Sequence, residues 1–292
     1  MWFNWRDIEN PDAGGAEVVT HQIARRLVRR GYQVTVFSAE FSGCQPKEMI
    51  DDVQYVRSGG RYLVYKRARE FYRDNHSSFD LIIDEINTIP FFAPQFVNDK
   101  PIVALIHQLA REFWHYETPF PLSYLGHHFL EDWWLGLYRN IPTITVSDST
   151  RRDLESLGFM QVRTIPEGLD FEPLQELAAK EKIPTVIFTG RLKKAKLPHH
   201  AVRAFALIKK EVPEARLWVV GDGYMMNQLK KMNVPDVTFL GRVSNQFKLK
   251  LMRSAHLALV PAVREGWGLV VTETNAMGTP VVAYDVHGLR DA

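Results

Sequence analysis

The chain has 292 residues, of which 46% are hydrophobic and 24% are charged, so it can bury the cores of one large or two ordinary domains. Its single cysteine, Cys44, excludes an internal disulfide and a cysteine-based metal cluster, which is typical of a reducing cytoplasm. No run approaches the roughly 18 apolar residues of a spanning helix, and the N-terminal residues lack the regions of a signal peptide. We therefore expect a cytoplasmic protein, with peripheral membrane contact as an open alternative.

The formal net charge of +2 is unevenly distributed along the chain. Residues 183–292 carry 16 Lys and Arg against 8 Asp and Glu, whereas residues 1–182 carry 20 against 26. The C-terminal part is therefore expected to hold an anionic ligand. A basic region can also bind nucleic acid, but no nucleic-acid motif accompanies this one, so we expect no nucleic-acid partner.

Short apolar strands alternate with helical patterns, which predicts a parallel α/β architecture. The strands expected in the first half are 2–5, 33–37, 53–56, 81–83, 102–106 and 143–146. Those expected in the second half are 185–189, 216–220, 237–240, 257–260 and 281–283. We predict two Rossmann-like domains facing across a cleft, residues 1–170 and 183–292, joined by a polar connector over 171–182. Ligands should bind at the carboxyl ends of the strands.

Two features of the first half are candidates for ligand contact. Gly14 and Gly15 lie in the loop before a helix expected over 18–30, where paired glycines allow close backbone approach. The alternative is a tight strand-to-helix turn. His107 follows the strand expected over 102–106, although an isolated histidine is more often structural.

An aromatic-rich segment follows His107. Residues 111–124 have no helical periodicity and could pack under a loop, form an acceptor platform or meet lipid. Phe129, Trp133 and Leu137 recur at i, i+4 and i+8, which predicts a helix face in the core. Three further histidines could suggest a metal, but their spacing and the lack of paired carboxylates argue against one: His115, His127 and His128.

Two further segments have a predicted role, one near the end of the first domain and one at the start of the second. The run 145–150 ends a strand and should cap a helix through Asp148 or Ser149. In the second domain, Arg191 and Lys196 follow the first strand, where a planar guanidinium and an ammonium can bind phosphate oxygens. Such charge-assisted bonds contribute about 1.5–3 kcal/mol each.

Glycine-containing loops follow the next strands of the second half. Gly221 lies in a Gly-Asp-Gly turn after the strand 216–220, and Arg242 and Val243 follow the strand 237–240. A lone Gly-Asp-Gly occurs in many folds. It is therefore weak evidence for a nucleotide pocket.

The stretch 264–284 carries the strongest signal. Gly266 and Gly268 precede a helix expected over 269–277, whose first amides can bind a phosphate. Glu265 in the loop and Glu273 in the helix flank that anion site and can accept hydrogen bonds from hydroxyls. A phosphate beside hydroxyl acceptors indicates a sugar nucleotide.

This Glu-x7-Glu stretch, with glycines at its second and fourth positions, resembles the donor-binding signature of retaining GT-B glycosyltransferases, in particular glycosyltransferase family 4. The Gly-Gly-x-Glu loop at 14–17, the Gly-Arg-Leu segment at 190–192 with Lys196, and His107 fit the same family. The resemblance covers nearly the whole chain. It implies transfer of a hexose from a nucleoside diphosphate sugar to an acceptor, with retention of configuration.

The resemblance also implies a role for each group. Glu265 would bind the sugar hydroxyls, Glu273 the ribose, and Arg191 with Lys196 the diphosphate, while His107 positions the transferred sugar. Backbone at further positions would line the donor site: Gly14, Gly15, Gly221, Arg242, Val243, Gly266, Trp267, Gly268, Leu269 and Val270. The leaving diphosphate would help deprotonate the acceptor, so no metal or other cofactor is expected. The base remains open among UDP, GDP, ADP and TDP, and the acceptor among a glycan, a lipid-linked molecule and a small molecule.

The chain departs from the family pattern at two places. Glu167 stands in the segment 165–170 where Asn commonly precedes the glycine, and Leu197 replaces a glycine after Lys196. The pattern also continues beyond Ala292 in the family, so we expect an incomplete second domain, either in a fragment or in a fold completed by another copy of the chain. A nucleotide-sugar epimerase of the same fold, or a binding-only truncated homologue, are the alternative functions.

Overall fold

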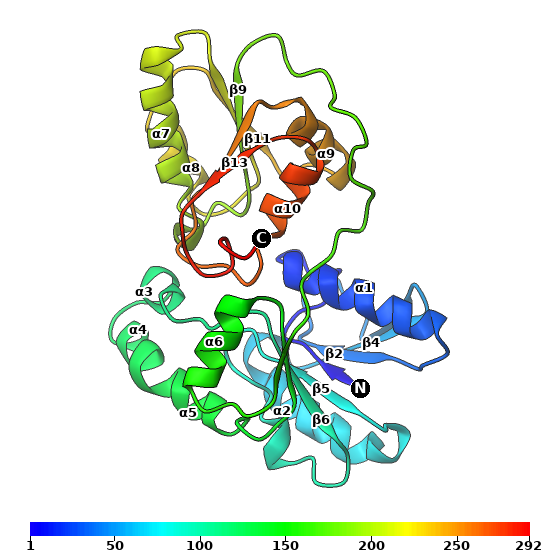
Figure 1. Cartoon of the computed structure of the whole chain (residues 1–292). Helices are drawn as coiled ribbons and strands as arrows, with labels where there is room; N and C mark the ends of the chain where they lie inside the picture. The colour runs from blue at the N-terminus through cyan, green and yellow to red at the C-terminus, as the bar shows by residue number, and fades with distance from the viewer. The chain divides into compact units, whose positions relative to one another are not determined.

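The computed structural model describes all residues from Met1 to Ala292. Contacts within the chain divide it into two compact units. The first unit contains residues 1–111 and 125–167, and the second contains 112–124 and 168–292. Figure 1 shows the course of the chain through both units. None of the helices combines the length and the apolar character that crossing a bilayer requires.

The first unit is built on an eight-stranded sheet in the order β3-β4-β2-β1-β5-β6-β7-β8. All neighbouring strands are parallel except the edge pair β3 and β4. The strands are β1 (Trp2–Phe3), β2 (Thr35–Ser38), β3 (Lys47–Ile50), β4 (Val53–Arg57), β5 (Ile82–Glu85), β6 (Ile102–Ile106), β7 (Thr143–Thr145) and β8 (Val162–Thr164). The longer helices are α1 (Gly15–Arg29), α2 (Gly60–Asn75) and α6 (Asp148–Ser156). The π-helical turn η3 (Gly126–Leu130) continues directly into α5 (Glu131–Gly136), whereas α4 (Leu122–Leu125), which precedes η3, falls mostly in the second unit.

Successive side chains along each strand point to opposite faces of this sheet, so the hydrophobic core of the first unit has two layers. Trp2 and Val36 point to the face covered by α1, where Ala24 is fully buried. Phe3 and Phe37 point to the opposite face and pack against α2. Because neighbouring strand residues point to opposite faces, an almost continuous apolar run is needed to fill both layers.

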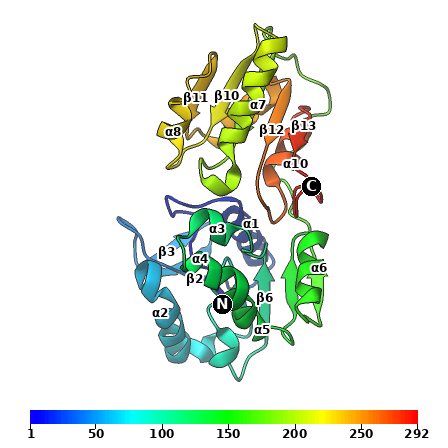
Figure 2. The same ribbon diagram turned by 90° about the vertical axis from the view of Figure 1, so that its left-hand side faces the viewer.

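The second unit contains a five-stranded parallel sheet in the order β11-β10-β9-β12-β13, most of which can be followed in Figure 2. Its strands are β9 (Thr185–Thr189), β10 (Arg216–Val220), β11 (Val237–Gly241), β12 (Leu257–Val260) and β13 (Val281–Ala283). Its helices and turns are α3 (Phe113–Glu117), η4 (Lys194–Lys196), α7 (Pro198–Glu211), α8 (Met226–Lys230), α9 (Asn245–Ser254) and α10 (Leu269–Ala276). Val186 and Phe188 pack with α7 and α8 on one face, whereas Ile187 packs with α9 on the other. This division matches the helices on the two sides of the sheet in Figure 1.

The strand predictions are confirmed most closely in the second unit. All five expected strands are present there, and β11 extends one residue further, to Gly241. In the first unit the edge strand β3 and the short strand β8 were not expected. Strand β3 alternates between exposed and half-buried residues, so it has no apolar run that would indicate a strand.

The helix face predicted from Phe129, Trp133 and Leu137 is wrong. These side chains are exposed, and Trp133 retains 66% of its accessible surface. The buried face carries Glu131 and Leu135 instead. Glu131 is turned inwards because its carboxylate accepts hydrogen bonds from the backbone N–H groups of Ala110 and Arg111, at 2.5 and 2.9 Å, and so the aromatic stripe faces outwards.

The cap of α6 also differs from the prediction. The N-cap residue is Ser147, whose hydroxyl accepts a hydrogen bond from the Thr150 N–H at 3.2 Å. Asp148 is the first helical residue rather than the cap. Its carboxylate therefore lies in the first turn, where it interacts favourably with the helix dipole.

Candidate functional site

In the second unit, two predicted residues meet where the strand order reverses. After β9 the chain places β10 on one side and later β12 on the other, so the loops following β9 and β12 diverge from a common point. Open parallel sheets bind ligands outside the carboxyl ends of the strands at such a point. Lys196 belongs to η4 after β9, and Glu265 follows β12. The Lys196 ammonium donates a hydrogen bond to Glu265 Oε1, and both side chains are about one-fifth exposed.

Backbone contacts fix the Glu265 loop. The Val263 N–H donates to the carbonyl of Ala195 at 3.0 Å, and the Glu265 N–H donates to the carbonyl of His287 at 3.0 Å. A Cβ at Gly288 would lie 2.1 Å from the Glu265 carbonyl oxygen, and Gly288 has a φ of +80°. Only glycine fits at this position, so the last residues of the chain pack directly on the loop.

The Gly-Asp-Gly turn supports the loop that carries Arg191. A Cβ at Gly221 would lie 2.0 Å from the carbonyl oxygen of Gly190, and the φ of Gly221 is +128°. The backbone N–H of Leu192 donates to the Asp222 carbonyl at 2.8 Å. Arg191 lies between these two contacts, so the turn that the sequence singled out has a clear packing role in holding its backbone.

The residues from Gly266 to Val270 form one turn into α10. Gly268 is the N-cap, with a φ of +101°. The first turn of a helix has amides without intrahelical partners and the positive end of the helix dipole. The indole N–H of Trp267 is buried and has no acceptor within the chain. Donor groups from backbone and side chain therefore lie along the same turn as Glu265.

Glu273 has a partner that the sequence did not indicate. Lys248 on α9 donates to both carboxylate oxygens of Glu273, each at 2.7 Å. Their side chains are 20% and 14% exposed. Nothing distinguishes this lysine from its neighbours in the sequence, because only the packing of α9 beside α10 brings it to Glu273. Arg242 and Val243 follow β11, two strands away from β9.

The paired glycines of the first unit form the start of α1. Gly14 is the N-cap and Gly15 the first helical residue. The Gly14 N–H donates to Glu17 Oε2 at 2.6 Å, and Arg6 Nε donates to Glu17 Oε1 at 2.9 Å. Glu17 thus holds the turn by satisfying one of the amides that a helix start leaves free.

His107 lies just beyond β6 between two buried carboxylates. Its Nδ1 is 2.8 Å from Glu167 Oε1, and its Nε2 is 3.3 Å from Glu85 Oε1 without making a regular hydrogen bond. Burial opposes protonation of the imidazole, but the hydrogen bond to Glu167 and the two negative charges outweigh it and raise the pKa of His107 to about 10. Glu167, at which the sequence departs from the family pattern, therefore contacts His107.

Glu85 is a site residue that the sequence reasoning missed. Its Oε2 accepts hydrogen bonds from Trp2 Nε1 at 2.8 Å and from Thr20 Oγ1 at 2.6 Å. The side chain is fully buried at the carboxyl end of β5, beside β6. A charged residue at the end of a predicted strand was a signal that could have identified it, because such positions face the ligand side of a parallel sheet.

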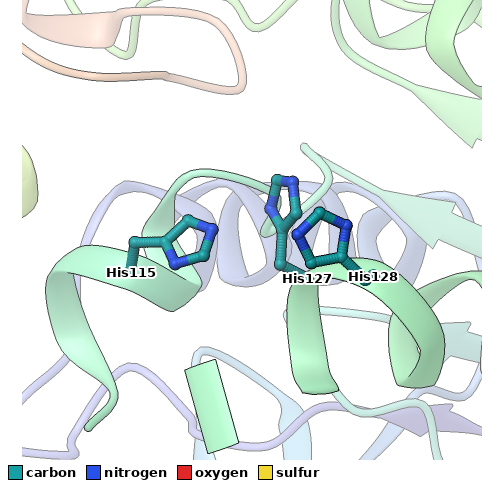
Figure 3. Close-up of side chains that lie close together, drawn as sticks. All are labelled: His115, His127 and His128. Atoms are coloured by element: carbon teal, nitrogen blue, oxygen red, sulfur yellow. The ribbon is translucent and has the colours of Figure 1, made fainter. Parts of the chain in front are cut away.

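The histidines His115, His127 and His128 are not assigned to a metal site. His127 and His128 are consecutive residues of η3 with ring centroids 4.5 Å apart, and both rings are drawn in Figure 3. His115, also labelled there, lies on α3, which belongs to the second unit. We assign no metal site to residues drawn from both units.

Comparison with known proteins places both units in the same group. The family model for Glycosyltransferase Family 4 matches residues 13–173, and the model for Glycosyl transferases group 1 matches residues 171–292. Glycogen synthase of Mycobacterium tuberculosis is 28% identical over 176 residues, which are 56% of this chain and 42% of that protein. The chain thus spans less than half the length of this curated relative.

Solved structures share the fold along almost the whole chain. Sucrose-phosphate synthase from Thermosynechococcus elongatus superimposes with a TM-score of 0.77 at 20% identity and covers 99% of this chain and 82% of its own. HepE of Anabaena, solved in complex with UDP and glucose, gives a TM-score of 0.67 at 16% identity, covering 99% of this chain and 81% of its own. The match over residues 13–173 and the shared architecture show that the chain belongs to glycosyltransferase family 4 and has the GT-B fold.

Proposed function

We propose that the protein transfers a hexose from a nucleoside diphosphate sugar to an acceptor hydroxyl with retention of configuration. The observation that carries this proposal is the meeting of Lys196 and Glu265 outside β9 and β12, beside the N-terminus of α10. A cation and a helix start suit a diphosphate, and an adjacent carboxylate suits sugar hydroxyls. Membership in glycosyltransferase family 4 supports the same assignment.

Each group has a distinct task in the proposed reaction. The bond between the anomeric carbon and the diphosphate oxygen breaks, and a bond to the acceptor oxygen forms. Lys196, Arg191 and the amides at the start of α10 stabilise the charge that develops on the leaving diphosphate. The acceptor proton passes to that leaving group. Since these residues supply the positive charge, the proposal requires no metal.

The carboxylates orient the donor. Glu265 accepts hydrogen bonds from the hexose hydroxyls, while Glu273, oriented by Lys248, accepts them from the ribose. In the first unit, His107 is the group that would contact the transferred sugar. Positioning of this kind converts binding energy into rate.

A thermal-shift titration tests the donor site. UDP comes first because HepE is solved with it, followed by GDP, ADP, TDP and NAD. A nucleotide at 100 times its dissociation constant adds about 2.7 kcal/mol of stability. Arg191→Ala should weaken binding about 10- to 150-fold, corresponding to roughly 1.5–3 kcal/mol. Lys231→Ala, at the end of α8, is the matched control for loss of a positive charge and should bind like the wild type.

A transfer assay tests the chemistry. Glu265→Ala should abolish sugar transfer, and unchanged turnover would refute the proposal. Release of an isomerised nucleotide sugar without added acceptor would instead show an epimerase. Nucleotide binding with neither transfer nor hydrolysis would show a binding-only protein.

A further inference from the structure

Two buried carboxylates lie on either side of His107 within the first unit. Glu85 approaches from the carboxyl end of β5, next to the strand that leads into His107. Glu167 comes from the chain after β8 and reaches Nδ1 at 2.8 Å. The side chains of Glu85, His107 and Glu167 are 0%, 9% and 7% exposed. Little solvent is therefore available to stabilise either carboxylate in place of the imidazole.

With both carboxylates ionised, a count of donors favours a protonated His107. A neutral imidazole has one N–H, so it could face only one of the two carboxylates with a donor. The other buried carboxylate would then meet a nitrogen lone pair, which is repulsive. An imidazolium presents one N–H to each side. Buried charges are stable when they are paired, and this arrangement pairs one cation with two anions.

The two carboxylates differ in how they are held. Glu85 is fixed through its other oxygen by Trp2 and Thr20, both of which are buried. Its free oxygen, Oε1, and the Nε2 of His107 lie 3.3 Å apart, and neither has a regular hydrogen-bond partner. Nδ1 is engaged by Glu167, and the second N–H of an imidazolium, at Nε2, faces the free oxygen of Glu85.

We propose that Glu85 and Glu167 are positioning residues that keep His107 as an imidazolium, so that it acts on the sugar as a positive charge and not as a base. This inference rests on the proposed function for the contact between His107 and sugar. It gives Glu167 a specific task, because its carboxylate lies 2.8 Å from Nδ1 of His107. The other close polar contact of His107 involves no charge: the hydroxyl of Thr150 on α6 donates a hydrogen bond to the backbone carbonyl of His107.

Nuclear magnetic resonance of the imidazole tests the protonation state without any substrate. The His107 signals are assigned by comparison with His107→Asn. In the wild type they should not titrate between pH 6 and 9, because the pKa of His107 is raised to about 10. Removing an opposite charge within hydrogen-bond distance shifts a pKa by about 1–3 units, so Glu167→Gln should bring the titration towards the neutral range. Glu155→Gln, an exposed carboxylate on α6, is the matched control and should leave it unchanged.

The same variants are then followed by the pH dependence of kcat/KM. The wild type should show no loss from His107 between pH 6 and 9. In Glu167→Gln, kcat/KM should fall about tenfold for each pH unit above the lowered pKa of His107, and Glu167→Asp should restore part of the wild-type profile. A small loss that is equal at every pH would indicate a merely structural role and overturn the proposal.

The outcomes separate this inference from the proposed function. A wild-type His107 that titrates below pH 8, or a Glu167→Gln variant with the wild-type titration, overturns the imidazolium. If the titrations follow the expectation but no sugar is transferred, the proposed function fails and the role of His107 on the sugar fails with it, while the paired imidazolium stands. Glu85→Gln should lower the pKa of His107 in the same way; should this variant fail to fold because the carboxylate is buried, Glu167→Gln alone decides the matter.

Discussion

Gly221 has no room for a side chain, and replacing it should disturb the Arg191 loop. A Cβ there would lie 2.0 Å from the Gly190 carbonyl oxygen, about 1 Å closer than such contacts allow, so the two backbone segments must separate. The strained φ of +128° costs about 1–3 kcal/mol for alanine, and the forced separation adds a further cost of about 1–3 kcal/mol. Gly221→Ala should therefore lower the free energy of unfolding by roughly 2–6 kcal/mol.

Gly241→Ala provides the control within the same sheet. Gly241 also has a positive φ, +67°, but a Cβ there would meet nothing within 4 Å. Its replacement should cost only about 1–2 kcal/mol, the penalty of the left-handed conformation. Urea denaturation gives the midpoints, and nucleotide titration reports the Arg191 loop, which only Gly221→Ala should disturb. If the two variants unfold with midpoints that agree and bind nucleotide equally, the argument from the Gly190 contact is wrong.

Three further predictions concern other parts of the chain. Leu135→Ala should lower the free energy of unfolding by about 2–5 kcal/mol, whereas Trp133→Ser should change it by less than about 0.5 kcal/mol, and the reverse order in urea denaturation would contradict the orientation of α5. Lys248→Met should weaken nucleotide binding about tenfold in calorimetry, because Glu273 loses both hydrogen bonds that orient it, and an unchanged dissociation constant would exclude that role. The stabilisation from protonated His107 is complete below its ordinary pKa of 6.5 and is lost as the pH rises through about 10, so the free energy of unfolding should fall by up to about 1.4 kcal/mol per pH unit in that window. His107→Gln should show a shallower slope in pH-dependent denaturation, and equal slopes would mean that His107 binds no extra proton on folding.

The architecture was predictable because its signals are local. Buried parallel strands need short apolar runs, and the five strands of the second unit appear as such in the sequence. The edge strand β3 lacks this signal because it is buried on neither face. The stripe of Phe129 and Trp133 led to a wrong prediction of the buried helix face for a related reason. Periodicity identifies one face of a helix, but the buried carboxylate of Glu131 decides which face points inwards.

The candidate donor site was predictable only where its residues lie in loops next to strands. Lys196 and Glu265 follow two central strands, so topology alone brings their loops together. Lys248 lies in the middle of a helix, and its contact to Glu273 depends on how α9 packs. A side chain's partner across 25 residues is a property of tertiary packing, and no local pattern contains it.

Glu167 illustrates what a departure from a family pattern can mean. In the sequence it departs from the pattern of the family that the chain resembles, and that alone indicates neither gain nor loss of function. In the structure its side chain is 7% exposed, and a carboxylate buried to this extent is costly without a cationic partner. That partner is His107, 60 residues earlier in the chain. An imidazole can gain or lose its charge, whereas a lysine in its place would remain a cation. The net charge of this buried pair therefore depends on the protonation of His107. A substitution at position 167 should therefore act mainly through His107, even though the two lie on different loops.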